Sequence, residues 1–275
     1  MVDVHDRVIL VGGKEGACPD KDQVNPVRTA PGRRENALVR GESGRKMSLL
    51  EVIAQTEADA EAAESGGADR IEVVADVRAG GLSPDPRTVA GMRRVTSLPM
   101  RVMLRAKTGF RTTGPELERL RRAAIEHAEA GADGFVFGFL APAGAVDTAA
   151  TETLADAIAP LPWTFHRAVD NAACPDAAWL AIRALPGLDA VLSAGSARGV
   201  EVGMEALLRR AASEASLMVV GGGLRRKHVA VLVAAGVDAF HVGAAVRRLG
   251  VVGAGAVDAS LVRGWRVLVD ASPYV

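Results

Sequence analysis

The chain has 275 residues, of which 49% are hydrophobic and 24% charged, a composition typical of a soluble protein with one large domain or two small ones. Lys plus Arg and Asp plus Glu are equal at 33 each, so the net charge of zero removes the simplest electrostatic case for a nucleic-acid or membrane-surface partner. No apolar run reaches the roughly 18 residues that span a bilayer, and the N-terminus does not resemble a secretory signal. Two cysteines are too few for a disulfide framework. We therefore expect a cytoplasmic protein.

Residues 1–46 differ in character from the rest of the chain. They are rich in glycine, proline and scattered charge, and they have almost no periodic apolar pattern. Such a segment buries too little apolar surface to offset the entropy lost on ordering, so we predict a disordered N-terminal extension. An alternative is that Met47 is the native first residue. In either case residues 47–275 form the predicted domain.

From Met47 onward, short β-rich runs alternate with alanine-rich stretches of helical period. Strands joined by helical crossovers pair in parallel, so the pattern predicts a parallel sheet with helices packed on it. Eight such strands are expected, at Leu49–Ala54, Arg70–Val74, Arg101–Arg105, Gly134–Phe139, Trp163–His166, Ala190–Ser193, Leu217–Val220 and Ala239–Val242.

A repeated turn supports this count. A glycine, a second residue and an aspartate stand before strands two, four, six and eight, with the aspartates at Asp69, Asp133, Asp189 and Asp238. Glycine there ends a helix in the left-handed conformation. A βαβα unit used four times predicts a (β/α)8 TIM barrel. A doubly wound open sheet is the alternative, although no GxGxxG follows the first strand to support it.

Polar residues cluster at the carboxyl ends of the predicted strands, which is the functional face of a (β/α)8 barrel. Because buried charge without a partner is costly, we expect these groups to share one pocket. Considered singly, some have a simpler explanation: the two glutamates could pair with Arg105, and His166 could be an ordinary core histidine. The candidate catalytic residues are Glu51, Glu72, Arg105, His166, Arg167, Asp170 and His241.

Glycines follow the last two strands. Gly221, Gly222 and Gly223 come after strand seven, and Gly243 comes after strand eight. Loops seven and eight commonly bind phosphate in this fold, because glycine lets backbone N–H groups approach an anion. We therefore predict an anion site there. The alternative is that these glycines only permit tight turns.

Seven short motifs, in this order and spacing, resemble the copper homeostasis protein CutC family. The resemblance implies a cytosolic (β/α)8 barrel, often dimeric, with a role in copper tolerance, and we therefore expect a homodimer. The motifs are GGADRIEV (66–73), GGLSPDP (80–86), VMLR (102–105), GFVFGFL (134–140), TFHRAVD (164–170), LSAG (192–195) and GGGLRRKHV (221–229).

The sequence departs from the family pattern after strand three, where Arg-Pro-Arg is replaced by Arg105-Ala106-Lys107, and at two positions in strands one and two. Family members often have cysteine two residues after each strand glutamate, where this chain has Ile53 and Val74. With the period of two in a strand, those thiols would face the same way as the glutamates. Copper(I) prefers sulfur ligands, and Cys174 is the only cysteine left in the domain, so we predict weak cuprous binding. Copper is thus implied by the resemblance alone, and the residues identify no metal and no cofactor.

Three functions fit these observations. The first is a CutC-like metal-binding or trafficking protein in copper homeostasis. The second is an enzyme acting on a small anionic, phosphorylated or carboxylated metabolite, with His166 as acid/base, Glu51 or Glu72 as its partner, and Arg105 and Arg167 binding the substrate. The third is a non-catalytic binding barrel. The inward-facing charges favour the first two, so the expected ligand is a small molecule or a metal rather than a nucleic acid or a membrane.

Overall fold

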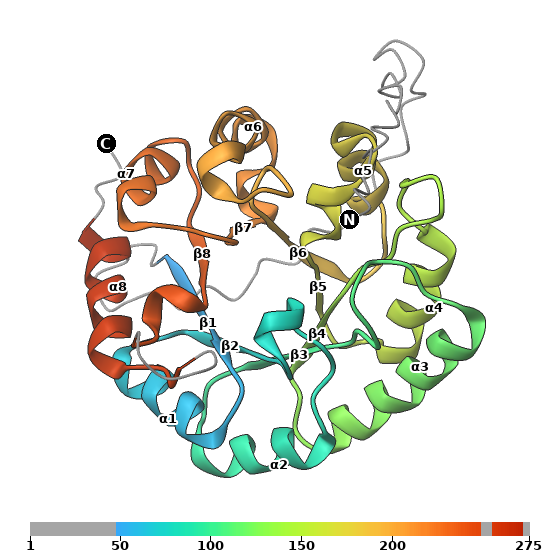
Figure 1. The fold of residues 1–275 in the computed structure, drawn as a ribbon, viewed down its shortest axis with the longest axis horizontal. Helices are drawn as coiled ribbons and strands as arrows, with labels where there is room; N and C mark the ends of the chain where they lie inside the picture. Colours follow the sequence, from blue (N-terminus) through green and yellow to red (C-terminus); the bar gives the residue numbers. More distant parts are fainter. Residues whose placement is uncertain (1–47, 249–254, 272–275) are drawn as a thin grey trace, which may run out of the picture.

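The computed structural model describes residues 48–248 and 255–271, and in it eight parallel strands close into a barrel (Figure 1). Each strand pairs with its neighbours in the sequence, and β8 pairs with β1, where His241 lies opposite Glu51. This closure confirms the predicted (β/α)8 barrel and excludes the open sheet. The predicted N-terminal extension, residues 1–46, lies outside the described residues.

The strands lie close to their predicted positions. The first and last have the predicted bounds, and the others differ by one or two residues at one end or at both. The strands are β1 (Leu49–Ala54), β2 (Arg70–Val73), β3 (Met100–Met103), β4 (Gly134–Phe137), β5 (Trp163–Phe165), β6 (Leu188–Ser193), β7 (Met218–Val220) and β8 (Ala239–Val242).

In the described part of the chain each strand is followed by an α-helix, and Figure 1 shows these helices arranged around the strands. Side-chain caps start several of them, for example Thr113, which forms a reciprocal capping box with Glu116. No helix there is both long and apolar enough to cross a membrane. The helices are α1 (Glu57–Gly66), α2 (Pro86–Val95), α3 (Gly114–Glu129), α4 (Thr148–Ile158), α5 (Pro175–Ile182), α6 (Val200–Glu214), α7 (Arg226–Ala234) and α8 (Ala259–Ala271).

The repeated glycine–aspartate turns have a structural role. The turn glycines all have positive φ, between 71° at Gly187 and 107° at Gly131. The Asp69 carboxylate accepts a hydrogen bond from the backbone N–H of Leu50 at 2.6 Å, and Asp133 accepts one from Met100 at 2.9 Å. These two aspartates therefore tie the start of an odd-numbered strand to the turn before the next strand.

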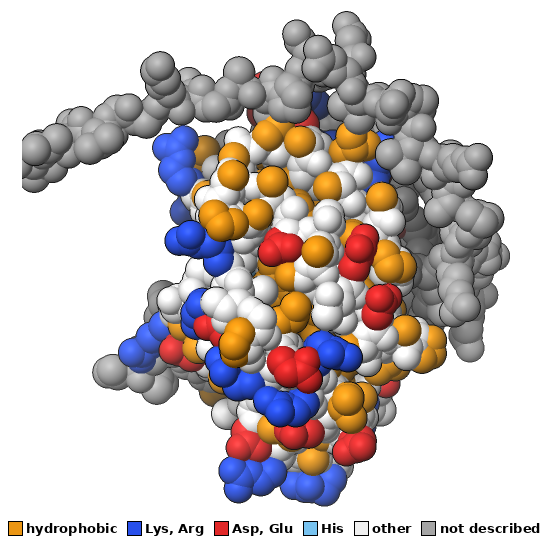
Figure 2. Space-filling model, turned by 90° about the vertical axis from the view of Figure 1, so that its right-hand side faces the viewer, with side chains coloured by type: hydrophobic (Ala, Val, Ile, Leu, Met, Phe, Trp, Pro, Cys, Tyr) orange, Lys and Arg blue, Asp and Glu red, His pale blue; other side chains and the backbone are white. Residues whose placement is uncertain are grey.

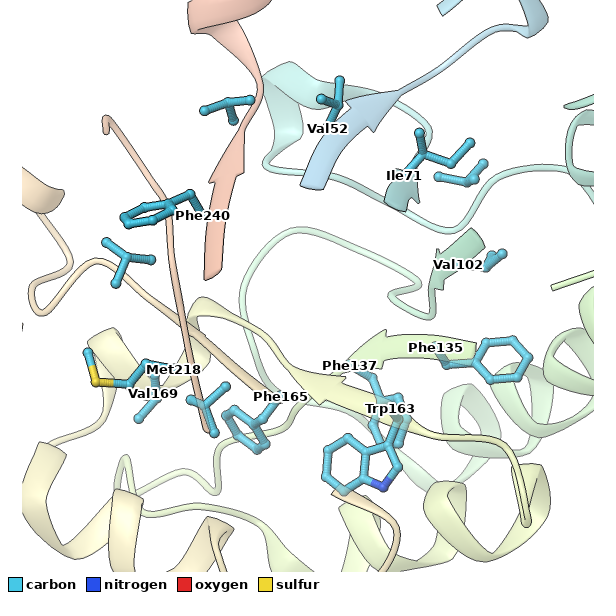
Figure 3. Packing of buried hydrophobic residues seen from close by; sticks show 14 of the residues in the cluster. Val52, Ile71, Val102, Phe135, Phe137, Trp163, Phe165, Val169, Met218 and Phe240 are labelled. Carbon is cyan, nitrogen blue, oxygen red and sulfur yellow. The ribbon is translucent and has the colours of Figure 1, made fainter. Parts of the chain in front are cut away.

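The main hydrophobic core lies between the strands and the helices. Figure 3 shows residues of this core, including Phe137, Trp163 and Phe165, and the Phe137 and Trp163 rings are stacked with their centroids 4.3 Å apart. Val52 of β1 and Ile71 of β2 belong to the same core. Because side chains alternate along a strand, their neighbours Glu51 and Glu72 face the inside of the barrel.

The surface shows charges of both signs. On the face drawn in Figure 2, acidic and basic side chains are interspersed over the lower part, and hydrophobic atoms are scattered among them. This face therefore has no large patch of a single sign, in line with the balanced composition.

Candidate functional site

Four ionisable side chains form a connected group inside the barrel. Glu51 comes from β1, Arg70 and Glu72 from β2, and His241 from β8, and all four residues are buried. His241 Nδ1 lies 2.8 Å from Glu51 Oε1, and Arg70 Nε donates to Glu51 Oε2 at 2.5 Å. On the other side of the imidazole, Nε2 lies 3.4 Å from Glu72 Oε2. We call these four residues the interior cluster.

The environment separates the acidities of the two glutamates. Burial favours the neutral form of both. For Glu51, the charge of Arg70 and the hydrogen bond with His241 outweigh burial and lower the pKa to about 2. For Glu72, burial and the nearby Glu51 charge outweigh the attraction of His241 and raise the pKa to about 7. Although burial opposes a charged imidazole, the two glutamates raise the pKa of His241. Glu51 is therefore ionised, whereas Glu72 and His241 each hold a proton more tightly than they would in water.

Several buried polar atoms inside the barrel have no hydrogen-bond partner among the described residues. Glu72 Oε1 and Arg70 Nη2 are two of them, and Thr164 Oγ1 is a third. Arg101, which forms an ion pair with Asp189, also leaves Nη1 without a partner. Buried polar groups normally have partners, so the interior has unused capacity to bind a polar ligand.

Apolar side chains cover the interior cluster toward the carboxyl ends of the strands. Ile53 and Val74 each stand two residues beyond a cluster glutamate, and they pack in one group with Met103 and Val136. A Cβ added at Gly243 would lie 2.7 Å from Ile53 Cδ1, so Ile53 also reaches over β8. The positions where the family often has cysteine therefore face inward, as predicted, and they carry hydrocarbon here.

His166 and Arg105 form a second group, around Phe110. The His166 ring meets the Phe110 ring edge-on at 5.3 Å, and the Arg105 guanidinium lies over that ring at 5.0 Å. Burial, together with the charges of Arg105 and Arg167, lowers the pKa of His166 to about 3. His166 is therefore neutral at physiological pH, and its Nδ1 accepts a long hydrogen bond from the Ala168 N–H at 3.4 Å.

The prediction of one shared pocket was wrong for Arg105. Arg105 lines a hollow with Lys107 and Phe110, and none of Glu51, Glu72, His166 and His241 lines that hollow. The guanidinium is turned away because Nη1 donates to the carbonyls of Gly80 and Gly81, at 3.0 and 3.2 Å. The alternative pairing of both glutamates with Arg105 is also wrong, since Arg70 pairs with Glu51 instead.

Arg167 and Asp170 form a third group with the loop after β6. Asp170 accepts hydrogen bonds from the Ser193 hydroxyl at 2.6 Å, the Ala194 N–H at 2.9 Å and Arg167 Nε at 2.9 Å. Arg167 also donates to the carbonyl of Ser196 at 3.0 Å. These contacts hold the loops after β5 and β6 together. They give Arg167 and Asp170 a structural role that requires no ligand.

The glycines of the predicted anion site are closely packed. A Cβ at Gly221 would lie 2.8 Å from His241, and one at Gly222 would lie 2.7 Å from the Arg167 guanidinium, whereas Gly223 faces open space. Gly222 and Gly223 also have positive φ, of 88° and 81°. Packing thus explains Gly221, Gly222 and Gly243, in agreement with the tight-turn alternative, while the anion site stays a prediction.

Two further arginines, Arg70 and Arg101, contribute to the polar interior but were not among the predicted site residues. Arg70 stands one strand period before Glu72, and Arg101 stands two strand periods before Arg105, so strand alternation alone places both arginines on the same side as these candidates. The rule that functional residues stand at the carboxyl ends of barrel strands does not include them. The polar interior extends further toward the amino ends of the strands than that rule suggests.

Comparison with known proteins identifies the family. A model of the CutC family matches residues 48–246, which covers every strand of the barrel. The chain belongs to the CutC family. A CutC family protein of Xanthomonas campestris pv. campestris strain 8004 is 36% identical over 200 residues, covering 71% of this chain and 82% of the relative. One from Klebsiella pneumoniae strain 342 is 33% identical over 197 residues, covering 71% and 79%.

Solved structures agree on the fold. A crystal structure described as a copper homeostasis protein CutC from Streptococcus agalactiae has a TM-score of 0.66 at 23% identity, covering 72% of this chain and 98% of that one. Phosphoribosyl anthranilate isomerase from Thermococcus kodakaraensis has a TM-score of 0.55 at 15% identity, covering 81% and 99%. At these identities the likeness shows a shared barrel alone.

Proposed function

We propose that this protein serves copper homeostasis, the role named for its structural relative from Streptococcus agalactiae. The observation that carries this proposal is the family match, which extends over residues 48–246 and includes both strand glutamates. The buried interior cluster supports it, because three of its members bring carboxylate and imidazole atoms within 4.8 Å of one another.

The donor set restricts the form of copper that the interior could hold. Copper(I) prefers thiolate and thioether ligands, whereas copper(II) accepts imidazole and carboxylate. Ile53 and Val74 supply no donor, and Met103 is the one sulfur-containing residue in the apolar group that they form. Cys174 lies outside the barrel at the start of α5 and is not a free thiol. A cuprous ion therefore does not fit the interior cluster. In the proposed role the protein either binds copper(II) or affects copper homeostasis without a copper ion inside the barrel.

The proposal can be tested in the organism that encodes the protein. Deletion of the gene should reduce growth in medium with added copper and change the total cellular copper measured by mass spectrometry. The wild-type gene should restore both, and the Glu72→Gln and His241→Gln variants should fail if the interior cluster is responsible. A deletion strain with unchanged copper tolerance and unchanged copper content would refute the role.

A second candidate function is acid/base catalysis on a small anionic metabolite, and one observation favours it. Glu72 and His241 are neighbours whose pKa values are both raised, so that a proton can move to or from this pair near neutral pH. The purified protein would be incubated with a metabolite extract, and consumed compounds would be identified by mass spectrometry. Consumption that is equal with Glu72→Gln would exclude this pair as the catalyst.

The proposal includes the cellular location and the oligomeric state of the protein. We expect a cytoplasmic homodimer, as the family resemblance implies. Cell fractionation and light scattering of the purified full-length chain test these two points separately.

A further inference from the structure

The distance between His241 and Glu72 is unusual for a hydrogen bond. Nε2 and Oε2 are 3.4 Å apart, whereas hydrogen bonds from nitrogen to oxygen usually measure about 2.7–3.2 Å. Two atoms bound to one tetrahedral ion at about 2.1 Å each lie about 3.4 Å apart. The two side chains therefore already have the separation of two ligands of a tetrahedral metal ion.

The other imidazole nitrogen is arranged as in metal sites. A histidine that binds a metal usually donates its second N–H to a carboxylate, which fixes the tautomer and the direction of the ring. Here Nδ1 lies 2.8 Å from Glu51 Oε1, and Glu51 is held in turn by Arg70 Nε at 2.5 Å. With the proton on Nδ1, the lone pair of Nε2 faces Glu72.

Glu72 supplies an independent observation, a buried carboxylate oxygen without a partner. Its Oε1 atom has no hydrogen-bond partner among the described residues, although the side chain is only 3% exposed. A buried carboxylate oxygen without a partner is costly, and a cation would remove that cost. Arg70 does not remove this cost, because its guanidinium pairs with Glu51 instead.

We propose that a divalent ion of the zinc class binds between His241 Nε2 and the Glu72 carboxylate, with Glu51 as the residue that orients the imidazole. This site does not depend on the copper role, and it can exist whether or not the protein affects copper tolerance. Nitrogen and oxygen donors suit zinc(II), whereas magnesium(II) prefers oxygen ligands in octahedral geometry, where neighbouring ligands are about 3.0 Å apart. The site should therefore select zinc(II) over magnesium(II).

The test uses the full-length chain, freed of metal with a chelator and dialysed. Isothermal titration with zinc chloride should give one site per chain, and excess magnesium chloride should not compete. Cobalt(II) added in place of zinc should give the intense visible absorption of a tetrahedral complex rather than the weak absorption of an octahedral one. Absence of a stoichiometric zinc site, or an octahedral cobalt spectrum, would overturn the proposal.

Variants assign the ligands. His241→Gln and Glu72→Gln should each weaken zinc binding at least about 100-fold, and Glu51→Gln should weaken it about 10- to 100-fold, the usual effect of losing an orienting partner. His127→Gln is the matched control, because it removes a buried histidine of α3, outside the barrel interior, and should leave the affinity unchanged. Circular dichroism of each metal-free variant checks folding. Zinc binding that survives in both His241→Gln and Glu72→Gln would show that the ion binds elsewhere, and the assignment would be wrong.

Discussion

Arg70 and Glu51 form an ion pair inside the barrel, with Nε and Oε2 2.5 Å apart and the side chains only 10% and 1% exposed. The two residues lie opposite each other in the pairing of β1 with β2. A buried pair of this kind adds little net stability when intact, but removal of one partner leaves a buried charge uncompensated.

Arg70→Met should therefore destabilise the protein by about 3–5 kcal/mol. Urea denaturation measures the change. Arg87→Met is the control, because Arg87 pairs with Asp85 at the surface and such pairs contribute about 0–1 kcal/mol. The double variant Arg70→Met/Glu51→Gln should recover part of the loss. A single-variant loss no larger than that of Arg87→Met would contradict the burial argument.

Glu72→Gln should change how stability depends on pH. The folded pKa of Glu72 is raised from 4.5 to about 7, so between these values the folded state binds more protons and stability falls as pH rises. The raised pKa of His241 acts in the same direction, because its contribution is complete below pH 6.5 and is lost as pH rises through the folded pKa.

From pH 5 to pH 8, the wild type should lose about 1–3 kcal/mol more stability than Glu72→Gln. Urea denaturation in the presence of a chelator measures both proteins, and the comparison cancels groups elsewhere in the chain. Parallel curves for the two proteins would show that Glu72 does not have a raised pKa.

His127→Leu should stabilise the protein most in acid. His127 of α3 is 1% exposed, and neither ring nitrogen has a hydrogen-bond partner among the described residues. Burial lowers its pKa from 6.5 to about 4, so the unfolded state binds more protons in this window and stability falls as pH falls. The increase in the free energy of unfolding caused by His127→Leu should be about 1–3 kcal/mol larger at pH 4.5 than at pH 7.5. Thermal unfolding at both pH values measures it, and an equal gain at both would refute the titration.

Restoring the two family cysteines should create a cuprous site. Ile53 and Val74 belong to one inward-facing apolar group, so Ile53→Cys/Val74→Cys would place two thiols near each other above the glutamates. Competition with a chromogenic cuprous chelator, without oxygen and with reductant, should show at least about tenfold tighter binding than the wild type. Each single variant is a control and should gain less. Tight cuprous binding by the wild type would contradict the argument from missing sulfur.

Gly222→Ala should be more harmful than Gly223→Ala. Both glycines have positive φ, so alanine is strained at either position by a similar amount. Only at Gly222 would the new Cβ meet another group, the Arg167 guanidinium at 2.7 Å, whereas Gly223 faces open space. We expect Gly222→Ala to cost about 1 kcal/mol more in urea denaturation, because Arg167 must move. Equal losses would show that Arg167 moves freely.

The fold was predictable because its signals are local. Turn glycines and aspartates, alternating strand residues and helical periods each act over a few residues, and they located all eight strands. Closure of the barrel also followed, since a repeat of four βαβα units leaves β1 and β8 to pair.

The grouping of the polar residues was predictable only in part. Position along the strands brought Glu51, Glu72 and His241 into one predicted group, and the three do lie together inside the barrel. It could not show that Arg105 bends toward the carbonyls of Gly80 and Gly81, because a long side chain is directed by contacts from another loop. Nor could it pair Arg70 with Glu51, since that contact depends on the register between two strands.

The polar interior also offers a way to distinguish the effects of the interior residues of this protein from the effects of its surface. The four residues of the interior cluster contact one another and are hidden from the surface, so they could be exchanged together for leucine and methionine of similar volume. Such replacements of buried ionic groups often leave a protein as stable or more stable. The resulting variant would have no ionisable side chains at these four positions and would keep its surface unchanged. Expressed in place of the natural gene, it would show which cellular effects arise from chemistry within the barrel and which from contacts made by its surface.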